Sequence, residues 1–316
     1  MTFRQAHMPA ASIDDADDFF RITTRTDTSD LVQSIQSVKG VINPPLLRSS
    51  ASGHHVVFGF RRIAACRVLG YRTISCRITD QPFLDCAKLA VVDNMSQRDL
   101  NTVELSNAIG LLARCSSGTA QLQNALLDLG LPAKSSFIAK MMQIQEMPAS
   151  LKSGIANNSI ALPVARKLTE LPVDDALVLA DLFRNLTVSL NKQLEITALT
   201  DEIAHREDIS ISDLFNEPEL SQILENENAE KSRAAGRLRT YLKKRRFPKL
   251  VGVEQNFENI KKSLKLPPNV QFQAPPYFEG DTYTIAIKFS SMEELEQCRK
   301  IFDRLISHPE LKTSLD

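Results

Sequence analysis

Two consecutive arginines, Arg61 and Arg62, lie just after a glycine at the end of a short apolar segment. Residues 55–58 have the composition of a buried strand, and residues 61–69 have the apolar spacing of a helix. A helix N-terminus binds anions, because its first N–H groups are unpaired and the helix dipole favours negative charge there. Gly59 would let the backbone approach a phosphate, and the guanidinium groups would bind its oxygens in pairs. These residues predict a phosphate site, although a solvated first turn of a helix explains the local pattern equally well.

A second candidate site lies in a helix–turn–helix pattern over residues 119–147. Residues 119–129 have an apolar helical face, residues 130–132 (Gly-Leu-Pro) predict a short turn, and residues 134–147 have the spacing of a second helix. The second helix of such a unit enters the major groove of DNA. Polar residues near its N-terminal, outward part could contact phosphates and base edges. They are Lys134, Ser135, Ser136 and Lys140. For each of them, an ordinary surface position on a helical hairpin is the alternative.

The elements that position these sites must belong to more than one domain. A chain of 316 residues is too long for one ordinary domain, so two or three are expected. The apolar content of 43% and the charged content of 24% are typical of a soluble globular protein. Because the formal net charge is zero, any role in nucleic-acid binding must depend on local clusters of charge.

The cysteines and the longest apolar runs bear on the cellular location. None of the five cysteines is spaced as C-x-x-C, which fits neither a zinc knuckle nor a disulfide framework. We expect free, mostly buried thiols in a reducing cytosol. No apolar run approaches the roughly 20 residues that a membrane helix needs, and no signal peptide opens the chain. The sequence therefore predicts a soluble, cytoplasmic protein without a membrane contact.

The pattern along the chain predicts an α+β protein of several parts. Residues 1–18 are polar and acidic, which indicates a flexible lead-in, and residues 19–98 alternate short strands with helices, which predicts a small α/β domain. Residues 99–206 are helical in pattern, with breaks at glycine and proline. Residues 207–250 form a highly charged segment. Residues 251–316 have the pattern helix-strand-strand-helix and predict a small αββα domain.

Opposite charges meet inside the segment of residues 207–250. Six acidic residues and no basic one lie between residues 213 and 230, whereas residues 231–250 hold nine basic residues and no acidic one. A helix over the basic run would be basic nearly all round and could follow DNA phosphates without reading sequence. A solvated linker helix that pairs with the preceding acidic run is the alternative, and we favour it slightly.

Three segments in order resemble the signature of the ParB/KorB-type partition family. Residues 31–44 resemble the helix that leads to the family's G-[VIL]-x-Q-P corner, and the G-F-R-R run of residues 59–62 resembles its G-E-R-R box. Residues 93–104 are similar to the family segment E-N-L-Q-R-E-D-L-N-P-I-E, with the register intact. The resemblance covers about residues 20–172. It implies a ParB/sulfiredoxin-like α/β N-terminal domain followed by an all-helical helix-turn-helix domain.

The resemblance also implies a ligand. In that family the two boxes hold the triphosphate of CTP and its magnesium ion, and the nucleotide closes a dimeric clamp around DNA. The residues of this chain that would bind nucleotide are Gly59, Arg61, Arg62, Arg25 and Asn94. Those that would face magnesium as oxygen ligands are Asp93 and Asn94.

Two departures from the family pattern bear on activity. Phe60 stands where the box has glutamate, and residues 96–98 (Ser-Gln-Arg) replace Q-R-E. Without that glutamate we expect nucleotide binding, and at most a slow CTPase. The predicted function is that of a nucleotide-dependent clamp on double-stranded DNA, which acts in chromosome or plasmid segregation. A ParB-fold transcriptional regulator without a nucleotide switch is the alternative, and Phe60 favours it. A small-molecule kinase, which the same α/β fold also hosts, would leave the helix-turn-helix without a role.

Partners also follow from the resemblance. The αββα pattern is similar to the small dimerisation domain that ends many ParB proteins, and a second copy would cover the apolar strand face of residues 282–289. A homodimer associated with the nucleoid is therefore expected. A ParA-type ATPase is the partner that the family implies, although the N-terminus has no basic L-G-R-G-L-like peptide.

Overall fold

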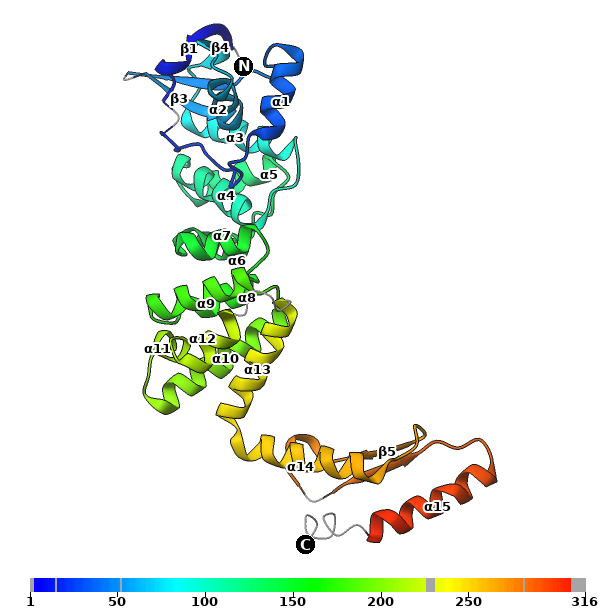
Figure 1. Cartoon of the computed structure of the whole chain (residues 1–316). Coiled ribbons are helices and arrows are strands. Elements are labelled where there is room, and N and C mark those ends of the chain that lie inside the picture. Colours follow the sequence, from blue (N-terminus) through cyan, green and yellow to red (C-terminus); the bar gives the residue numbers. More distant parts are fainter. Residues whose placement is uncertain (1–2, 15, 52, 226–230, 281, 308–316) are drawn as a thin grey trace. The chain divides into compact units, whose positions relative to one another are not determined.

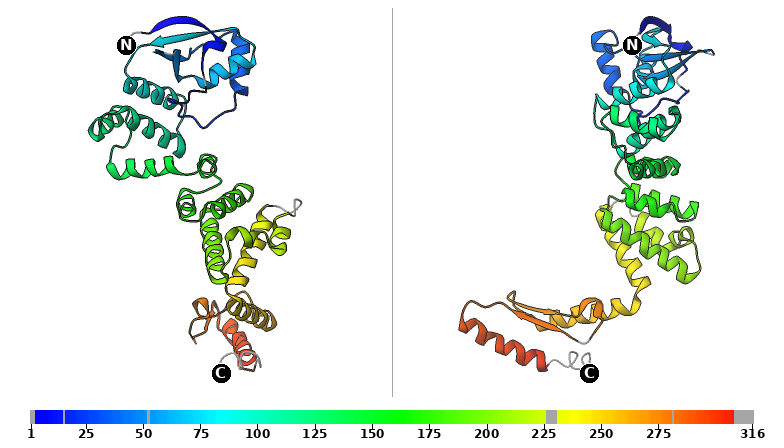
Figure 2. Two further views of the ribbon diagram at one scale, coloured as in Figure 1. Left: turned by 90° about the vertical axis from the view of Figure 1, so that its left-hand side faces the viewer. Right: turned by 180° about the vertical axis from the view of Figure 1, so that it is seen from behind.

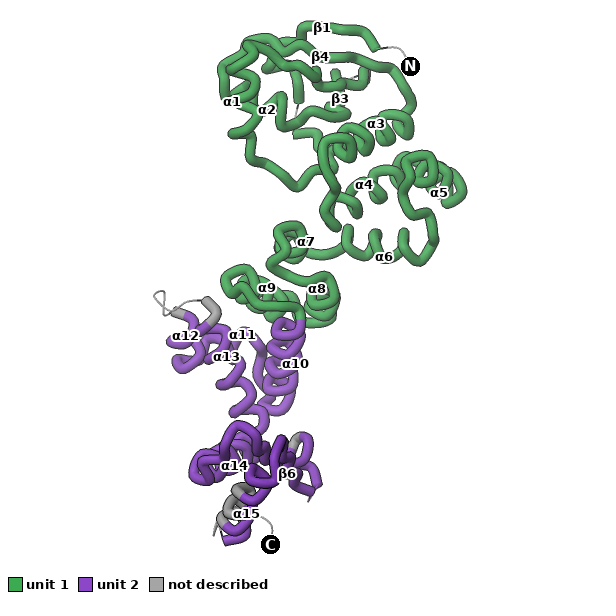
Figure 3. The backbone as a smooth tube through the Cα atoms, turned by 90° about the vertical axis from the view of Figure 1, so that its right-hand side faces the viewer, with its two compact units in different colours: residues 1–190 green, residues 191–316 purple. Residues whose placement is uncertain are grey.

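Figure 1 shows the computed structural model of the chain, with its helices and strands labelled. It divides into two compact units, Met1–Leu190 and Asn191–Asp316, which Figure 3 shows in different colours. The described residues are 3–14, 16–51, 53–225, 231–280 and 282–307. Unit 1 contains a four-stranded sheet with helices, and unit 2 contains helices and a two-stranded sheet, so the predicted α+β class is confirmed. Within the described residues, no helix has both the length and the apolar character that a membrane crossing needs.

The sheet of unit 1 has the strand order β1-β4-β2-β3. Its strands are β1 (Arg4–Pro9), β2 (Leu46–Ser50), β3 (Gly53–Phe58) and β4 (Thr73–Thr79). β2 and β4 are parallel, whereas β1 pairs with β4 and β2 pairs with β3 in antiparallel fashion. The strand predicted over residues 55–58 is therefore present in β3, and β2 and β4 are further short strands within the predicted α/β domain of residues 19–98. Figure 2 shows the sheet and its helices from two further sides.

Side-chain alternation along the strands places helices on both faces of the sheet. Leu47 and Val56 belong to one buried cluster with residues of α1 (Ser29–Val38) and α2 (Phe60–Val68). Their neighbours Leu46 and Val57 are also almost fully buried. Because successive side chains of a strand point to opposite faces, these two lie on the other face, where α3 (Phe83–Met95) contacts β3. The β3–α2 corner is thus fixed by packing on both sides.

The predicted flexible lead-in is wrong, because β1 lies within residues 1–18. β1 pairs along its whole length with β4, and Ala10 and Ile13 after it are buried in the core. An edge strand is held mainly by backbone hydrogen bonds, which do not depend on side-chain type. A polar sequence can therefore form such a strand without the apolar alternation that predicts one.

The rest of unit 1 is helical, as predicted from residue 99 onward. Its helices are α4 (Thr102–Cys115), α5 (Thr119–Asp128), α6 (Ser135–Glu146), α7 (Ala149–Ala156), α8 (Leu162–Leu168) and α9 (Val173–Asn185). Asn101 caps α4, since its side chain accepts the N–H groups of Val103 and Glu104 while the Glu104 side chain accepts the N–H of Asn101. This capping box fixes where α4 begins.

Unit 2 begins within a helix and runs to the C-terminal part of the chain. Its elements are α10 (Leu190–Glu207), α11 (Ile211–Phe215), α12 (Pro218–Glu225), α13 (Lys231–Arg246), α14 (Pro248–Leu264), β5 (Val270–Gln273), η2 (Pro276–Phe278), β6 (Thr284–Ile287) and α15 (Met292–Ser307). The border predicted between residues 206 and 207 falls inside this unit. The acidic and basic runs inside the charged segment also lie in this unit, where α13 forms ion pairs with Glu195, Glu202, Glu207 and Glu217.

The predicted helix-strand-strand-helix order of the tail is present as α14, β5, β6 and α15. β5 and β6 pair in antiparallel fashion, and Phe257, Ile260 and Phe272 form a small buried core with side chains of both strands. Ile285 and Ile287 are half-buried on the face of β6 that meets this core. Part of the apolar strand face that was expected to need a second copy is therefore covered by α14.

Four cysteines are free thiols, as expected: Cys66, Cys76 and Cys86 are buried, and Cys115 is half-buried. Burial raises the pKa of the Cys76 and Cys86 thiols to about 11, which makes both poor nucleophiles. The side chain of the fifth cysteine, Cys298, lies outside the described residues.

Candidate nucleotide and DNA sites

A small pocket lies over the N-terminus of α2, where β3 ends. Its walls come from the segment before α1, the first turn of α2 and the end of α3. Five residues predicted to bind nucleotide or magnesium line it: Gly59, Arg61, Arg62, Asp93 and Asn94. The free space is about 60 Å³, whereas small-molecule sites usually offer roughly 300–1,000 Å³. The structure therefore brings the predicted residues together around a small pocket.

Gly59 is required at this corner by the shape of the backbone. Its φ of 95° is unfavourable for other residues, and a Cβ atom there would lie 2.9 Å from the Cα of Pro45. Among the described residues no side chain caps α2. The N–H groups of its first turn can therefore bind an anion.

Arg61 is bound to the N-terminal end of α1. Its Nε donates to the backbone oxygen of Asp27 over 2.7 Å, and its Nη2 lies 2.7 Å from Oδ1 of Asp30. The Asp30 side chain is 66% exposed, so water competes for this ion pair. The pair is weak enough for an incoming anion to replace the carboxylate.

Arg62 makes a more enclosed contact. Its Nη2 lies 2.7 Å from Oδ2 of Asp93, and both side chains are only 11% exposed. Nη1 donates to the backbone oxygen of Asn43 over 2.6 Å, and Nε2 of Gln97 also donates to Asp93. The Asp93 carboxylate, which was predicted to face magnesium, thus accepts hydrogen bonds from Arg62 and Gln97.

Magnesium would have few protein ligands in this arrangement. Asn94 donates its amide hydrogen to the backbone oxygen of Ala90, which leaves its side-chain oxygen as an acceptor. Over the described residues, no three His, Cys, Asp or Glu side chains converge to hold a metal ion. Magnesium often binds through one or two protein oxygens, substrate phosphates and water. The residues therefore fit a magnesium ion only if phosphates provide most of its ligands.

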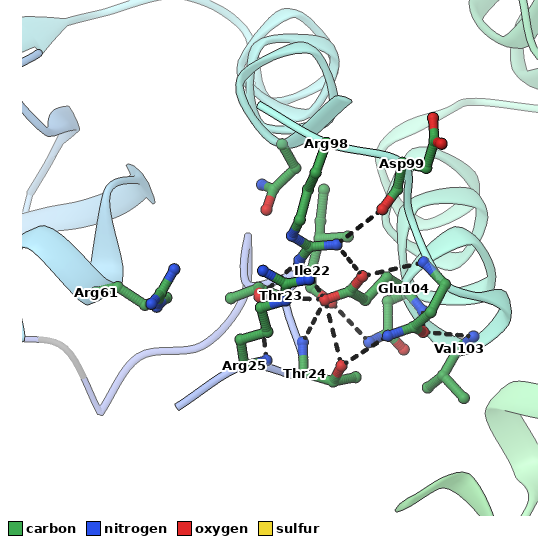
Figure 4. Close-up of polar contacts among 12 residues, drawn as sticks. Ile22, Thr23, Thr24, Arg25, Arg61, Arg98, Asp99, Val103 and Glu104 are labelled. Carbon is green, nitrogen blue, oxygen red and sulfur yellow. Dashed lines mark hydrogen bonds and ion pairs between the residues drawn. The ribbon is translucent and has the colours of Figure 1, made fainter. Parts of the chain in front are cut away.

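Arg98 and Glu104 form a polar centre between this pocket and the helical part of unit 1 (Figure 4). Arg98 Nη1 and Nη2 each lie 2.5 Å from one Glu104 oxygen, and the Glu104 side chain has no exposure. The N–H groups of Thr24 and Asn101 also donate to this carboxylate. Burial alone would raise the pKa of Glu104, but the hydrogen bonds from Arg98, Thr24 and Asn101 outweigh burial and hold the pKa at about 2. Glu104 thereby joins three segments of unit 1.

The predicted helix–turn–helix elements are present as α5 and α6, joined by a turn in which Gly130 has a φ of 68°. Helix α4 anchors α6 from one side: Ser106 Oγ donates to the backbone oxygen of Met141 over 2.7 Å, and Gln145 Nε2 donates to Ser106 Oγ over 2.8 Å. The residues predicted to contact DNA are all exposed. They are Lys134, Ser135, Ser136 and Lys140.

Comparison with known proteins identifies the N-terminal domain. Residues 16–95 match the family ParB N-terminal domain. The chromosome-partitioning protein ParB of Myxococcus xanthus is 24% identical over 151 residues, which cover 47% of this chain and 50% of that protein. Residues 16–95 thus form a ParB N-terminal domain, and about half of the chain is similar to ParB-type partition proteins.

Other relatives of this ParB-like chain include a nucleoid occlusion protein of Oceanobacillus iheyensis, 25% identical over 177 residues, 55% of this chain and 58% of that protein. The chain spans about half the length of the curated relatives it matches. Among solved structures it is similar to the C-terminally truncated ParB of Caulobacter crescentus complexed with CTP-gamma-S. That match has 23% identity, covers 57% of this chain and 98% of the other, and has a TM-score of 0.27.

The ParB-like chain departs from the family box at a core position. Phe60 is 8% exposed and belongs to the buried cluster of the sheet, α1 and α2. The guanidinium carbon of Arg21 lies 4.6 Å from the centre of its ring. The box glutamate is thus replaced by a side chain that contributes to packing.

The structure does not bring Arg25 into the pocket of the ParB-like N-terminal domain. Arg25 is exposed and lines a separate cleft of about 700 Å³ with Thr24, Asn101, Asn107 and Lys152. Sequence reasoning also missed Arg98, which lines both the pocket and the cleft. One signal was available in the sequence. Arg98 stands where the family segment has a glutamate, and it lies six residues before Glu104.

Proposed function

We propose that this chain is a DNA-binding partition protein whose N-terminal domain binds a nucleoside triphosphate in the pocket over α2. The observation that carries the proposal is the pairing of Arg61 and Arg62 with the uncapped first turn of α2. Two guanidinium groups and a helix N-terminus are complementary to phosphate. CTP is the nucleotide that the family resemblance implies.

Binding requires an exchange of anions. Arg61 and Arg62 are neutralised by Asp30 and Asp93, and the space of about 60 Å³ is too small for a triphosphate. Phosphate oxygens would take the place of Asp30 on Arg61, and the segment before α1 would move to admit the nucleotide. A magnesium ion would neutralise part of the phosphate charge, with the side-chain oxygen of Asn94 as its protein ligand. Because Phe60 provides no carboxylate, we expect slow hydrolysis at most.

DNA binding is assigned to α6. Its exposed N-terminal part presents Lys134, Ser135, Ser136 and Lys140, and α4 holds its opposite side. In a helix-turn-helix protein this is the part of the second helix that contacts base edges. A homodimer formed through the αββα part, closed as a clamp on double-stranded DNA by CTP, and a ParA-type ATPase partner complete the proposal. Chromosome or plasmid segregation is the corresponding role.

A ParB-fold transcriptional regulator without a nucleotide switch is the second candidate. It is favoured by the small volume of the pocket and by Phe60, which makes the box position part of the core. Such a protein would bind DNA through α6 equally well with and without CTP.

Equilibrium binding of labelled CTP with magnesium, against ATP and GTP, separates the two functions. We would compare the wild type with Arg61→Ala and with Lys140→Ala, which removes one positive charge from α6. Selective CTP binding that is lost only in Arg61→Ala supports the nucleotide-binding protein. A folded wild type that binds none of the three nucleotides but binds DNA selects the regulator.

A further inference from the structure

The basic helix α13 uses one set of its charged side chains inside unit 2. These ion pairs join Arg239 to Glu195, Arg245 to Glu207 and Glu217, Arg246 to Glu202, and Lys243 to Glu254. Most of the acidic partners lie in α10 and α14. The acidic run of residues 213–230, which the sequence suggested as the partner, contributes Glu217 to these pairs. The pairs hold α13 in the unit, so the helix is not a free linker.

A second set of basic side chains faces away from these pairs. Arg233, Arg237 and Lys244 are exposed and line an open hollow of about 710 Å³ together with Gly236, Thr240 and Tyr241. No acidic residue is among the described residues that line it. Tyr241 is turned inward, since its hydroxyl bonds to Glu217 and Arg245.

The spacing of these side chains forms one stripe along the helix. Arg233, Arg237 and Lys244 are separated by four and seven residues, which places them on one face. At 1.5 Å per residue the stripe is about 16 Å long. One strand of DNA advances about 3.4 Å per phosphate along its axis, so the stripe spans roughly five phosphates. Between the basic residues, a Cβ added to Gly236 would meet no atom within 4 Å, which leaves room for a backbone to approach.

We propose that this stripe, Arg233, Arg237 and Lys244, binds the phosphate backbone of double-stranded DNA without reading its sequence. The inference rests on the proposed function for the identity of the polyanion, and it adds a contact separate from α6. The stripe has three exposed basic side chains, and the described residues that line the hollow include no amide or carboxylate side chain that could select a base. Affinity that depends on charge alone is the property of a phosphate contact.

Such a contact has a characteristic salt dependence. Each phosphate neutralised by a basic side chain changes the slope of log K against log salt by about one. Removing Arg237 and Lys244 should therefore lower the magnitude of this slope by about two. The loss of affinity should be the same for DNA of any sequence. Because both side chains are exposed, the fold should not change.

The test uses the full chain and two 40-base-pair duplexes, one of random sequence and one recovered by selection from a random pool. Arg237→Ala/Lys244→Ala is compared with Arg72→Ala/Lys192→Ala, which removes the same charge at exposed positions that do not belong to the stripe. We expect about a tenfold loss for both duplexes at low salt in the stripe variant and less than a twofold loss in the control. Arg237→Lys/Lys244→Arg should restore binding.

The possible failures are distinguishable. A wild type that binds neither duplex overturns the proposed function and this inference together. Loss of the preference for the selected duplex in Lys134→Ala/Lys140→Ala tests α6 independently of the stripe. If the wild type binds DNA and the stripe variant keeps the wild-type slope and affinity, the stripe does not bind DNA. Binding of polyglutamate that is lost in the stripe variant, while the DNA slope stays unchanged, would reassign the stripe to an acidic protein segment.

Discussion

Arg62 and Asp93 form an ion pair of 2.7 Å at the pocket over α2, and the two side chains are equally enclosed, at 11% exposure each. The resemblance assigns one of these residues to phosphate and the other to magnesium. In this structure each neutralises the other. The pair therefore stabilises the fold in the absence of ligand. Arg61, by contrast, pairs with the exposed Asp30, so the two adjacent arginines should differ in their contribution to stability.

Loss of Arg62 should destabilise the protein much more than loss of Arg61. Arg62→Ala leaves the enclosed Asp93 carboxylate without its cation, which costs about 3 kcal/mol of unfolding free energy. Arg61→Ala removes a pair with the exposed Asp30, which is worth about 1 kcal/mol or less. Chemical denaturation of both variants measures the difference. In Arg62→Ala/Asp93→Ala much of the lost stability should return, and equal stabilities for the two single variants would contradict this account.

Removal of the competing carboxylate on α1 should strengthen nucleotide binding. Asp30→Asn frees Arg61 from its ion pair and takes one negative charge away from the phosphates. An exposed pair of this kind contributes about 0.2–1 kcal/mol, so the affinity for CTP should rise by a factor of about 1.5–5. Asp128→Asn, which breaks the exposed pair with Lys88, is the control and should bind CTP like the wild type. Weaker binding in Asp30→Asn would show that Asp30 contributes to the site.

Substitution of Gly59 should destabilise the N-terminal domain even without nucleotide. Gly59→Ala combines an unfavourable φ with a contact of 2.9 Å between the new Cβ and the Pro45 backbone, and we expect a loss of about 2–3 kcal/mol. Gly70 also has a positive φ, but a Cβ there meets no atom within 4 Å. Gly70→Ala should therefore cost only about 1 kcal/mol. Thermal unfolding of both variants isolates the contribution of Pro45.

The fold was predictable wherever a buried face repeats along one element. The strand of residues 55–58 and the helix after Gly59 have apolar side chains that follow the period of each element, and both are present. β1 was missed because its pairing with β4 uses backbone groups. Gly59, Arg61, Arg62, Asp93 and Asn94 line one pocket; they come from two of the family segments, and their roles in binding stay predictions.

The partners of the charged residues were not predictable. The sequence pairs the basic run with the acidic run just before it, yet Arg239 and Arg246 bind glutamates of α10 more than 40 positions earlier. Arg98 and Glu104 are close in sequence. However, the Glu104 carboxylate also accepts a hydrogen bond from the N–H of Thr24, which lies 80 positions away. Contacts of this kind depend on how distant segments pack, and local spacing contains no information on that.

The stability of unit 1 should depend on the ionisation of Glu104. Hydrogen bonds hold its pKa at about 2 in the folded protein, against 4.5 for an unperturbed glutamate. Because the folded-state pKa is lowered, the stabilisation is complete above about pH 4.5 and is lost as the pH falls toward 2. With about 1.4 kcal/mol per unit of pKa, the contribution is about 3 kcal/mol at neutral pH.

Glu104→Gln should remove this dependence. The amide cannot accept the charge-assisted bonds from Arg98, so the variant should be less stable at pH 7 by about 2–3 kcal/mol, and the difference from wild type should shrink between pH 4.5 and 2.5. Urea unfolding followed across that range measures it. Glu170→Gln, at an exposed position, is the control and should follow the wild type at every pH. A constant difference between Glu104→Gln and wild type would mean that lost packing, rather than lost charge, destabilises the variant.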